Sequence, residues 1–150
     1  MNEFFPVVDE ANNIVGRASR EECHRRQLIH RSVYVFLVNP RGEILIQRRS
    51  ASKDLYPGFF TGSATGHVDY GESYDEAAKR ELREELHVEA PLEKVSRFRS
   101  FSETEREFST LYVGQYDGEA QPDPMEVTET HFMSVEEIAG DLASAQRQYA

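Results

Sequence analysis

Cysteine is almost absent from this chain of 150 residues, which contains only Cys23. A single cysteine can neither form an intramolecular disulfide nor complete a cysteine-based zinc site, so a reducing cytoplasm is the expected location. No apolar run approaches the roughly 20 residues that a membrane-spanning helix needs, and residues 1–6 lack the basic and apolar regions of a signal peptide. We therefore expect a cytoplasmic protein with no membrane partner.

Positive charge is also scarce, because 17 lysines and arginines stand against 27 aspartates and glutamates, a formal net charge of −10 at pH 7. A surface of this sign repels polyanions, so no nucleic acid polymer is expected as a partner. A small phosphorylated ligand is still compatible with this charge, since carboxylates gathered around a divalent cation would attract it locally.

The length favours one domain, residues 1–150, because a chain of this size can bury its own core and no repeat or linker divides it. Alternating helix and strand signals predict an α/β protein with a mixed sheet covered by helices. A hairpin and a short helix are expected within residues 7–28. Helices are expected to begin at three Ser-x-x-Glu capping boxes, at Ser19, Ser73 and Ser134. The expected strands are residues 32–38, 43–47, 59–64, 95–101, 108–116 and 131–133.

The helix that follows the second capping box carries three glutamates at the edge of its buried face. Glu81, Glu84 and Glu85 lie within about 100° of one another around the helix axis, beside an apolar stripe that repeats every four residues from Ala78 to Leu86. Like charges at a partly buried edge repel by on the order of 1 kcal/mol per pair. A hard divalent cation such as magnesium would reverse that effect, although such spacing is also common on solvated helices.

A glycine-containing loop leads directly into this helix. It begins at Gly66 and ends at Gly71 and Glu72. A strand, loop and helix in this order bring backbone groups and a helix N-terminus close to a phosphate. The loop therefore favours a phosphate-handling site over a merely solvated helix.

Between Gly66 and Val88 the sequence resembles the Nudix box. That pattern is glycine, five residues, glutamate, seven residues, Arg-Glu, an aliphatic residue, any residue, Glu-Glu, any residue, glycine and an aliphatic residue. The matching positions are Gly66, Glu72, Arg80, Glu81, Leu82, Glu84, Glu85 and Val88. His87 replaces the last glycine, so either this histidine adopts the left-handed conformation or the helix ends differently.

The resemblance implies the Nudix fold, an α/β/α sandwich around a mixed β-sheet, and a divalent cation as cofactor. The cation would be Mg²⁺, or in some members Mn²⁺. Its implied ligands are Glu81, Glu84, Glu85 and the carbonyl group of Gly66. Arg80 would orient a glutamate through a bidentate ion pair, and Glu72 would brace the loop against the helix. A homodimer is also compatible with the family.

The implied reaction is attack of water on a phosphorus atom of a diphosphate, in a nucleoside diphosphate derivative or a similar small molecule. A carboxylate would accept the proton of the water. The candidates for this catalytic role are Glu84, Glu85 and, outside the box, Glu126. Because Glu126 belongs to a loop, a solvated side chain is an equally good interpretation of it.

Most of residues 7–133 resemble the Nudix branch that includes isopentenyl-diphosphate isomerases. The motifs that carry this resemblance are Val8-Asp9-Glu10, Ser19-Arg20, His30-Arg31, Gln47-Arg48-Arg49-Ser50, Lys53-Asp54 and Pro57-Gly58. The isomerases have an active-site cysteine just before the box glycine, where this chain has Thr65. Threonine has no accessible pKa for acid–base work. A hydrolase is therefore favoured, with an isomerase or a non-catalytic diphosphate-binding sensor as alternatives.

Four side chains are candidates for binding the substrate, namely Arg48, Arg49, Lys53 and His67. Basic residues after a strand are also common as solvated decoration of a sheet edge. The resemblance to the isomerases implies a second metal site with His30, Glu105 and Glu107 as its ligands, and whether that site exists stays open. His24 is expected on the surface of its helix. Three phenylalanines are expected in the core, Phe98, Phe101 and Phe108. A substrate base would stack on one of Phe59, Phe60 or Tyr70.

Overall fold

The computed structural model describes residues 4–53, 56–102, 105–144 and 147–149, so Asp54 and the ends of the predicted domain lie outside the described residues. The helices are α1 (Arg20–Arg26), α2 (Tyr74–Leu86) and α3 (Val135–Ser144). The strands are β1 (Phe4–Val8), β2 (Ile14–Ser19), β3 (His30–Val38), β4 (Ile44–Arg49), β5 (Phe60–Thr61), β6 (Ala64–His67), β7 (Leu92–Phe101), β8 (Arg106–Gln115) and β9 (Val127–Met133). None of the described helices is both long and apolar enough to span a membrane.

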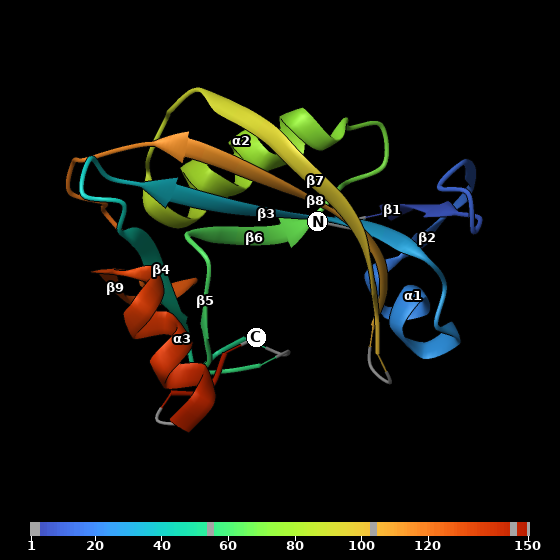
Figure 1. The fold of residues 1–150 in the computed structure, drawn as a ribbon. Helices are drawn as coiled ribbons and strands as arrows, with labels where there is room; N and C mark the ends of the chain where they lie inside the picture. The colour runs from blue at the N-terminus through green and yellow to red at the C-terminus, as the bar shows by residue number, and fades with distance from the viewer. Residues whose placement is uncertain (1–3, 54–55, 103–104, 145–146, 150) are drawn as a thin grey trace.

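A mixed seven-stranded sheet forms the centre of the molecule (Figure 1). Its strands follow the order β5-β4-β3-β8-β7, while β6 pairs with β3 and β9 pairs with β4. The central strands β3 and β8 are parallel over their whole length, and the other pairs are antiparallel. β1 and β2 form a separate two-stranded sheet beside α1. The hairpin and short helix expected within residues 7–28 are therefore present.

Helices cover opposite faces of the sheet, as two neighbouring residues of β4 demonstrate. Leu45 packs in the large core beneath α2, together with Leu82 of that helix. The next residue, Ile46, packs in a second cluster with Ile138 of α3. Because consecutive residues of a strand point to opposite faces, α2 and α3 enclose the sheet. The predicted α/β/α sandwich around a mixed sheet is confirmed.

Both ends of α2 follow the signals in the sequence. The Ser73 hydroxyl accepts a hydrogen bond from the Glu76 amide at 3.1 Å, and the Glu76 carboxylate accepts one from the Ser73 amide at 3.0 Å. At the other end His87 adopts the left-handed conformation, with φ 55° and ψ 37°, and its amide donates to the Arg83 carbonyl. Its ring nitrogen Nδ1 lies 2.6 Å from the carbonyl oxygen of Gln121. The histidine thus takes the turn that glycine would take.

The largest differences from the expected strands are found at residues 59–64 and before residue 131. The strand expected at 59–64 is two strands, because β5 pairs with β4 whereas β6 pairs with β3. β3 and β4 pair only at Val38 and Ile44, so they diverge and leave a space that β6 enters. β9 begins four residues before the expected strand because it pairs along β4. A local pattern of residues cannot reveal a change of partner strand.

The three phenylalanines expected in the core divide into two groups. Phe108 is buried, but Phe98 and Phe101 are 39% and 37% exposed. Both lie on β7, the last strand of the sheet. An edge strand has a neighbour on one side only, so its large side chains keep more of their surface exposed. The prediction of a core position is wrong for these two residues.

Candidate functional site

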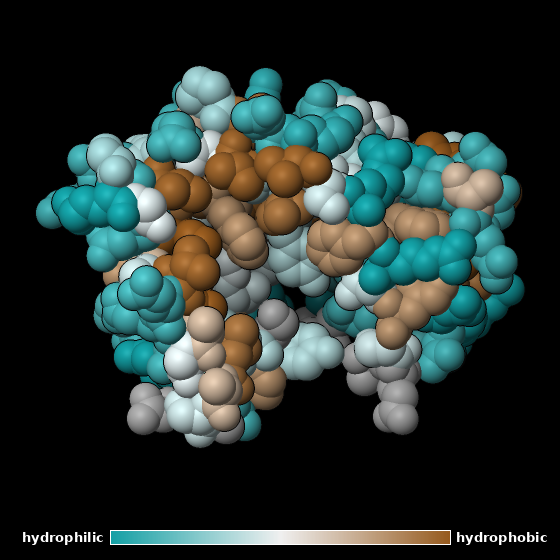
Figure 2. All heavy atoms as spheres, viewed as in Figure 1, coloured by the Kyte–Doolittle hydropathy of each residue, from teal (hydrophilic) through white to brown (hydrophobic). Residues whose placement is uncertain are grey.

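An open cleft of about 510 Å³ lies between α2, the loop after β4 and the β7–β8 hairpin. The space-filling view shows the molecule hollowed near its centre, between the part that carries α3 and the part that carries α1 (Figure 2). Most of the predicted site residues line this cleft. They are Arg49, Lys53, Gly66, His67, Arg80, Glu81, Glu84 and Glu126.

Gly66 and Glu81 are in close contact where α2 passes the edge of β6. A Cβ atom on Gly66 would lie 2.2 Å from Cδ of Glu81 and 2.3 Å from its Oε1. Any residue other than glycine at position 66 would place its Cβ atom where this carboxylate lies. The glycine therefore allows the Glu81 carboxylate to lie directly against the backbone of β6.

Arg80 joins the loop before α2 to the glutamates of the helix. Its Nε and Nη2 atoms donate to the two carboxylate oxygens of Glu72 at 2.8 and 3.0 Å. Its Nη1 atom donates to Glu81 at 2.7 Å and to Glu84 at 3.2 Å, and Nη2 also donates to the carbonyl oxygen of His67 at 2.9 Å. These are the contacts that the predicted orienting role of Arg80 and the bracing role of Glu72 require.

Glu85 is the most deeply buried of the three helix glutamates, with 2% of its surface exposed. Gln47 donates a hydrogen bond to its Oε1 at 2.6 Å, while its Oε2 has no hydrogen-bond partner among the described residues. Burial and the neighbouring Glu81 raise the pKa of Glu85 well above its ordinary value, and burial also raises the pKa of Glu81. A buried, unsatisfied carboxylate oxygen beside a second carboxylate fits a divalent cation.

The basic candidates separate according to the side of β4 on which they lie. Arg49 lines the cleft. Arg48 instead donates to the carbonyl oxygen of Gly58 at 3.0 Å, and its guanidinium lies 5.6 Å from the centre of the Phe60 ring. Alternation along the strand turns the two arginines to opposite faces. The structure therefore does not bring Arg48 to the cleft.

Lys53 and Glu126 form an ion pair at the mouth of the cleft. The backbone supports this arrangement, because the Ser50 amide donates to the Glu126 carbonyl at 3.0 Å. The candidate phosphate ligand and the candidate base outside the box thus lie in direct contact. A phosphate group that binds Lys53 would compete with this ion pair.

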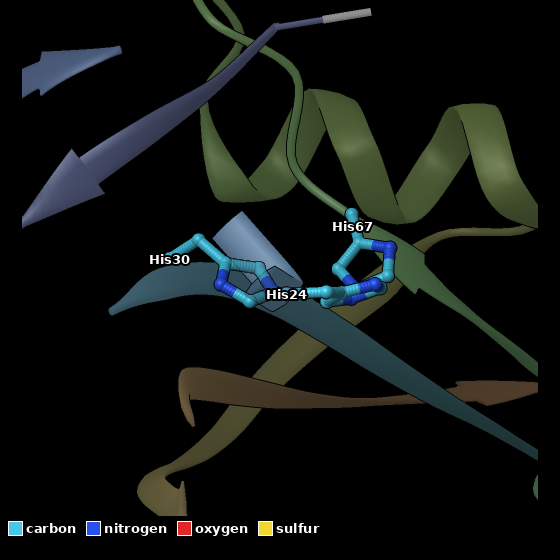
Figure 3. Close-up of side chains that lie close together, drawn as sticks. All are labelled: His24, His30 and His67. Atoms are coloured by element: carbon cyan, nitrogen blue, oxygen red, sulfur yellow. The ribbon is translucent and has the colours of Figure 1, made fainter. Parts of the chain in front are cut away.

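Three histidines from separate elements face one another beside the cleft: His24 of α1, His30 of β3 and His67 of β6 (Figure 3). One ring nitrogen from each lies within 4.8 Å of the others. His24 is therefore not the surface residue that the sequence indicated. Only the packing of α1 against the sheet brings it here, and no local pattern signals that contact.

Two glutamates of the β7–β8 hairpin complete this cluster. His67, Glu105 and Glu107 also offer ligand atoms within 4.8 Å of one another, and the Glu107 carboxylate lies 3.1 Å from His67 and 3.3 Å from His30. Burial and Glu107 raise the pKa of Glu105 to about 7. Burial opposes ionisation of Glu107 too, but its close contacts with His67 and His30 hold its pKa well below the usual range. Imidazole and carboxylate ligands together suit Zn²⁺ or Mn²⁺.

An α/β/α sandwich with the glutamates of one helix beside an open cleft is an arrangement suited to hold a divalent cation against a small phosphorylated ligand. The chain belongs to the NUDIX domain family, whose family model matches residues 28–150. The predicted family, fold class and enzyme class are thereby confirmed.

Relatives of the chain have both hydrolase and isomerase names. An isopentenyl-diphosphate Delta-isomerase of Serratia proteamaculans is 33% identical to this chain in sequence. The matched region covers 94% of this chain and 82% of the isomerase. A protein of Yersinia pestis named as an uncharacterized Nudix hydrolase is 36% identical to this chain, over 91% of this chain and 75% of the Yersinia protein. A crystal structure of a Deinococcus radiodurans protein superposes with a TM-score of 0.88 at 30% identity, covering 99% of this chain and 93% of the other.

The contact between Gly66 and Glu81 generates a first prediction. Gly66→Ala should displace the Glu81 carboxylate, because the new methyl group would overlap it, and should weaken Mn²⁺ binding as measured by electron paramagnetic resonance. Gly16→Ala is the matched control, since a Cβ there meets nothing within 4 Å. Unchanged Mn²⁺ affinity in Gly66→Ala would show that Glu81 is not held for a metal.

The histidine–glutamate cluster generates a second prediction. Protein supplied with Zn²⁺ or Mn²⁺ and then dialysed should retain an ion that elemental analysis detects, and His67→Asn should lose it. His131→Asn is the control, because that histidine lies on β9 and contacts Glu129 at the surface. Equal metal content in wild type and His67→Asn would contradict a second metal site.

Proposed function

We propose that this protein is a Mg²⁺-dependent hydrolase that cleaves the diphosphate linkage of a small molecule such as a nucleoside diphosphate derivative. The observation that carries the proposal is the buried Glu85 carboxylate, which has an unsatisfied oxygen and a raised pKa beside Glu81. Nudix enzymes in general use divalent cations, and Mn²⁺ would also fit these ligands. We assign the hydrolase to a single domain, residues 1–150.

The ligand set that we propose is Glu81, Glu84, Glu85 and the carbonyl group of Gly66. A bound divalent cation would lower the pKa of the attacking water and offset charge on the phosphate. Arg80 keeps two of these carboxylates in place through its hydrogen bonds. Burial of Glu85 makes its charge costly without a cation, so the same feature that weakens the metal-free fold favours metal binding.

The remaining steps use side chains around the cleft. Arg49 and Lys53 would bind phosphate oxygens, and Arg80 would hold the glutamates while water attacks phosphorus. The bond between that phosphorus and the bridging oxygen breaks, and the electron pair leaves with the second phosphate. A carboxylate accepts the proton of the water. Glu126 lies at the cleft for this role, and Glu84 and Glu85 are the alternatives within the helix.

An isomerase is the second candidate function, favoured by the name of the Serratia relative and by the histidine–glutamate cluster. Thr65, which stands in place of the isomerase cysteine and lines the cleft, argues against it. A hydrolase releases two products from one diphosphate, whereas an isomerase returns one product of the same composition after exchanging a proton with the solvent. Incubation of the protein with nucleoside and isoprenoid diphosphates in deuterium oxide, followed by mass spectrometry, separates the two, because only an isomerase would return an intact isoprenoid diphosphate that has gained deuterium. A diphosphate-binding sensor would give no product.

Glu85→Gln should have two effects at once: it should abolish turnover, and it should stabilise the metal-free protein. A raised pKa means that the folded protein binds more protons than the unfolded chain, so metal-free stability falls as the pH rises above the ordinary value of 4.5. Glutamine lacks that charge, so the variant should melt at a higher temperature than wild type above neutral pH. Replacement of a residue that only orients a metal ligand typically costs about 10–100-fold. The kcat/KM of Glu85→Gln should fall by more than that. Full activity in Glu85→Gln would refute the proposed metal site.

Glu126→Gln tests the candidate base outside the box. If Glu126 accepts the proton, kcat should fall by about 10²–10⁴-fold, while the melting temperature changes little because the side chain is partly exposed. Lys53→Met should mainly raise KM, since the lysine would bind phosphate. Glu129→Gln on β9 is the control. An unchanged kcat in Glu126→Gln would assign the base to a glutamate of α2.

A further inference from the structure

An aromatic surface, here called the aromatic wall, begins in the cleft at Tyr34 and extends past the residues that line the cleft to Phe98. Tyr34 of β3 lines the cleft, and the centre of its ring lies 5.8 Å from that of Phe98 on β7. Phe98 is 39% exposed although it lies on a strand of the central sheet. The space-filling view shows apolar side chains over the sheet just above the hollow (Figure 2). Exposed aromatic surface at the rim of a catalytic cleft is a feature that neither the core nor the metal sites explain.

The register of the strands places this surface on the same face of the sheet as His67. His67 pairs with Ser32, Ser32 with Ser109, and Ser109 with Phe98. Directly paired residues project to the same face, so Phe98 and His67 end one continuous row across β6, β3, β8 and β7. Three strand spacings of about 4.8 Å separate the ends of the row by about 14 Å. An elongated molecule with its phosphates near β6 could reach the aromatic wall, whereas inorganic diphosphate is too short.

Hydroxyl groups border the aromatic wall and define the chemistry of its ligand. Thr65 is paired with Tyr34 across β6 and β3, and Ser100 hydrogen-bonds to Tyr34. Burial and the nearby Glu107 raise the pKa of Tyr34 to about 12, so its hydroxyl stays neutral at physiological pH. A pure hydrocarbon chain would remove water from these groups without replacing its hydrogen bonds. A nucleobase provides both a flat face for stacking and a polar edge.

We infer that Tyr34 and Phe98 bind the base of a nucleoside diphosphate, and that Phe98 determines specificity for a flat ring. This inference rests on the proposed function, because it names the group attached to the diphosphate that the glutamates would act on. It also differs from the positions that the sequence indicated for a stacking residue, since Phe60 is buried beneath α3.

The same strand provides a matched control. Phe101 is exposed to nearly the same extent as Phe98, at 37%, but its position three residues further along β7 turns it to the opposite face. There it lies against the guanidinium groups of Arg99 and Arg106, 5.5 and 4.7 Å from its ring centre. Replacement of Phe101 therefore removes an equivalent side chain from β7 without altering the aromatic wall formed by Tyr34 and Phe98.

The test is equilibrium binding of uncleavable ligands by isothermal titration calorimetry in Mg²⁺. The ligands are the α,β-methylene analogues of nucleoside diphosphates and, without a nucleoside, methylenediphosphonate. Phe98→Leu keeps apolar volume but loses the flat ring, and it should weaken binding of the nucleoside analogues about tenfold or more. Methylenediphosphonate affinity should stay unchanged, and Phe98→Tyr and Phe101→Leu should behave as wild type.

Three results would overturn the inference. One is equal affinity of wild type and Phe98→Leu for every nucleoside analogue, and another is an equal loss for methylenediphosphonate. The third is a wild type that prefers an isopentenyl methylenediphosphonate and keeps this preference in Phe98→Leu, because the wall would then serve an alkyl group. Hydrolysis is judged separately. A wild type that binds the analogues through Phe98 but cleaves no diphosphate refutes the proposed function and leaves the base site intact.

Discussion

The candidate site depends on two carboxylates that the fold holds together in a poorly hydrated place. Glu85 is buried under the helix with one oxygen unsatisfied, and Glu81 lies against the backbone of Gly66. Neither position would be stable with full negative charge, and burial accordingly raises the pKa of both groups. A divalent cation is the simplest partner that satisfies such a pair. The metal-free fold therefore contains an unfavourable interaction that a bound divalent cation would remove.

The helix that holds these groups also anchors the core. Leu82 and Leu86 are almost fully buried against the sheet, which fixes the rotation of α2 and hence the direction of its acidic edge. Arg80 then connects that edge to the preceding loop through Glu72. Packing and catalysis are thus coupled, because a helix that rotated to expose Glu85 would also expose its apolar stripe. This explains how a buried carboxylate with an unsatisfied oxygen can persist at the site.

The elements outside the helix shape the rest of the cleft. The small N-terminal sheet and α1 place His24 against the central sheet, and Phe5 of β1 stacks on His67 at 4.7 Å. The β7–β8 hairpin presents alternate residues to the two sides, with Ser100 toward the cleft and Phe101 away from it. The metal end and the aromatic end of the cleft therefore come from segments that are far apart in the sequence.

The sequence alone determined the local features of this protein. The capping box at Ser73 and the spacing of the glutamates depend on residues within one helix length, so their pattern was sufficient to predict them. At His87 the sequence left two helix ends open, and the structure has the left-handed one. The tertiary structure decided which side chains meet across strands. His24 joins a cluster only because α1 packs against the sheet. Phe98 lies beside Tyr34 only because β8 places β7 next to β3. Such contacts depend on strand partners and packing, which no short-range pattern of residues encodes.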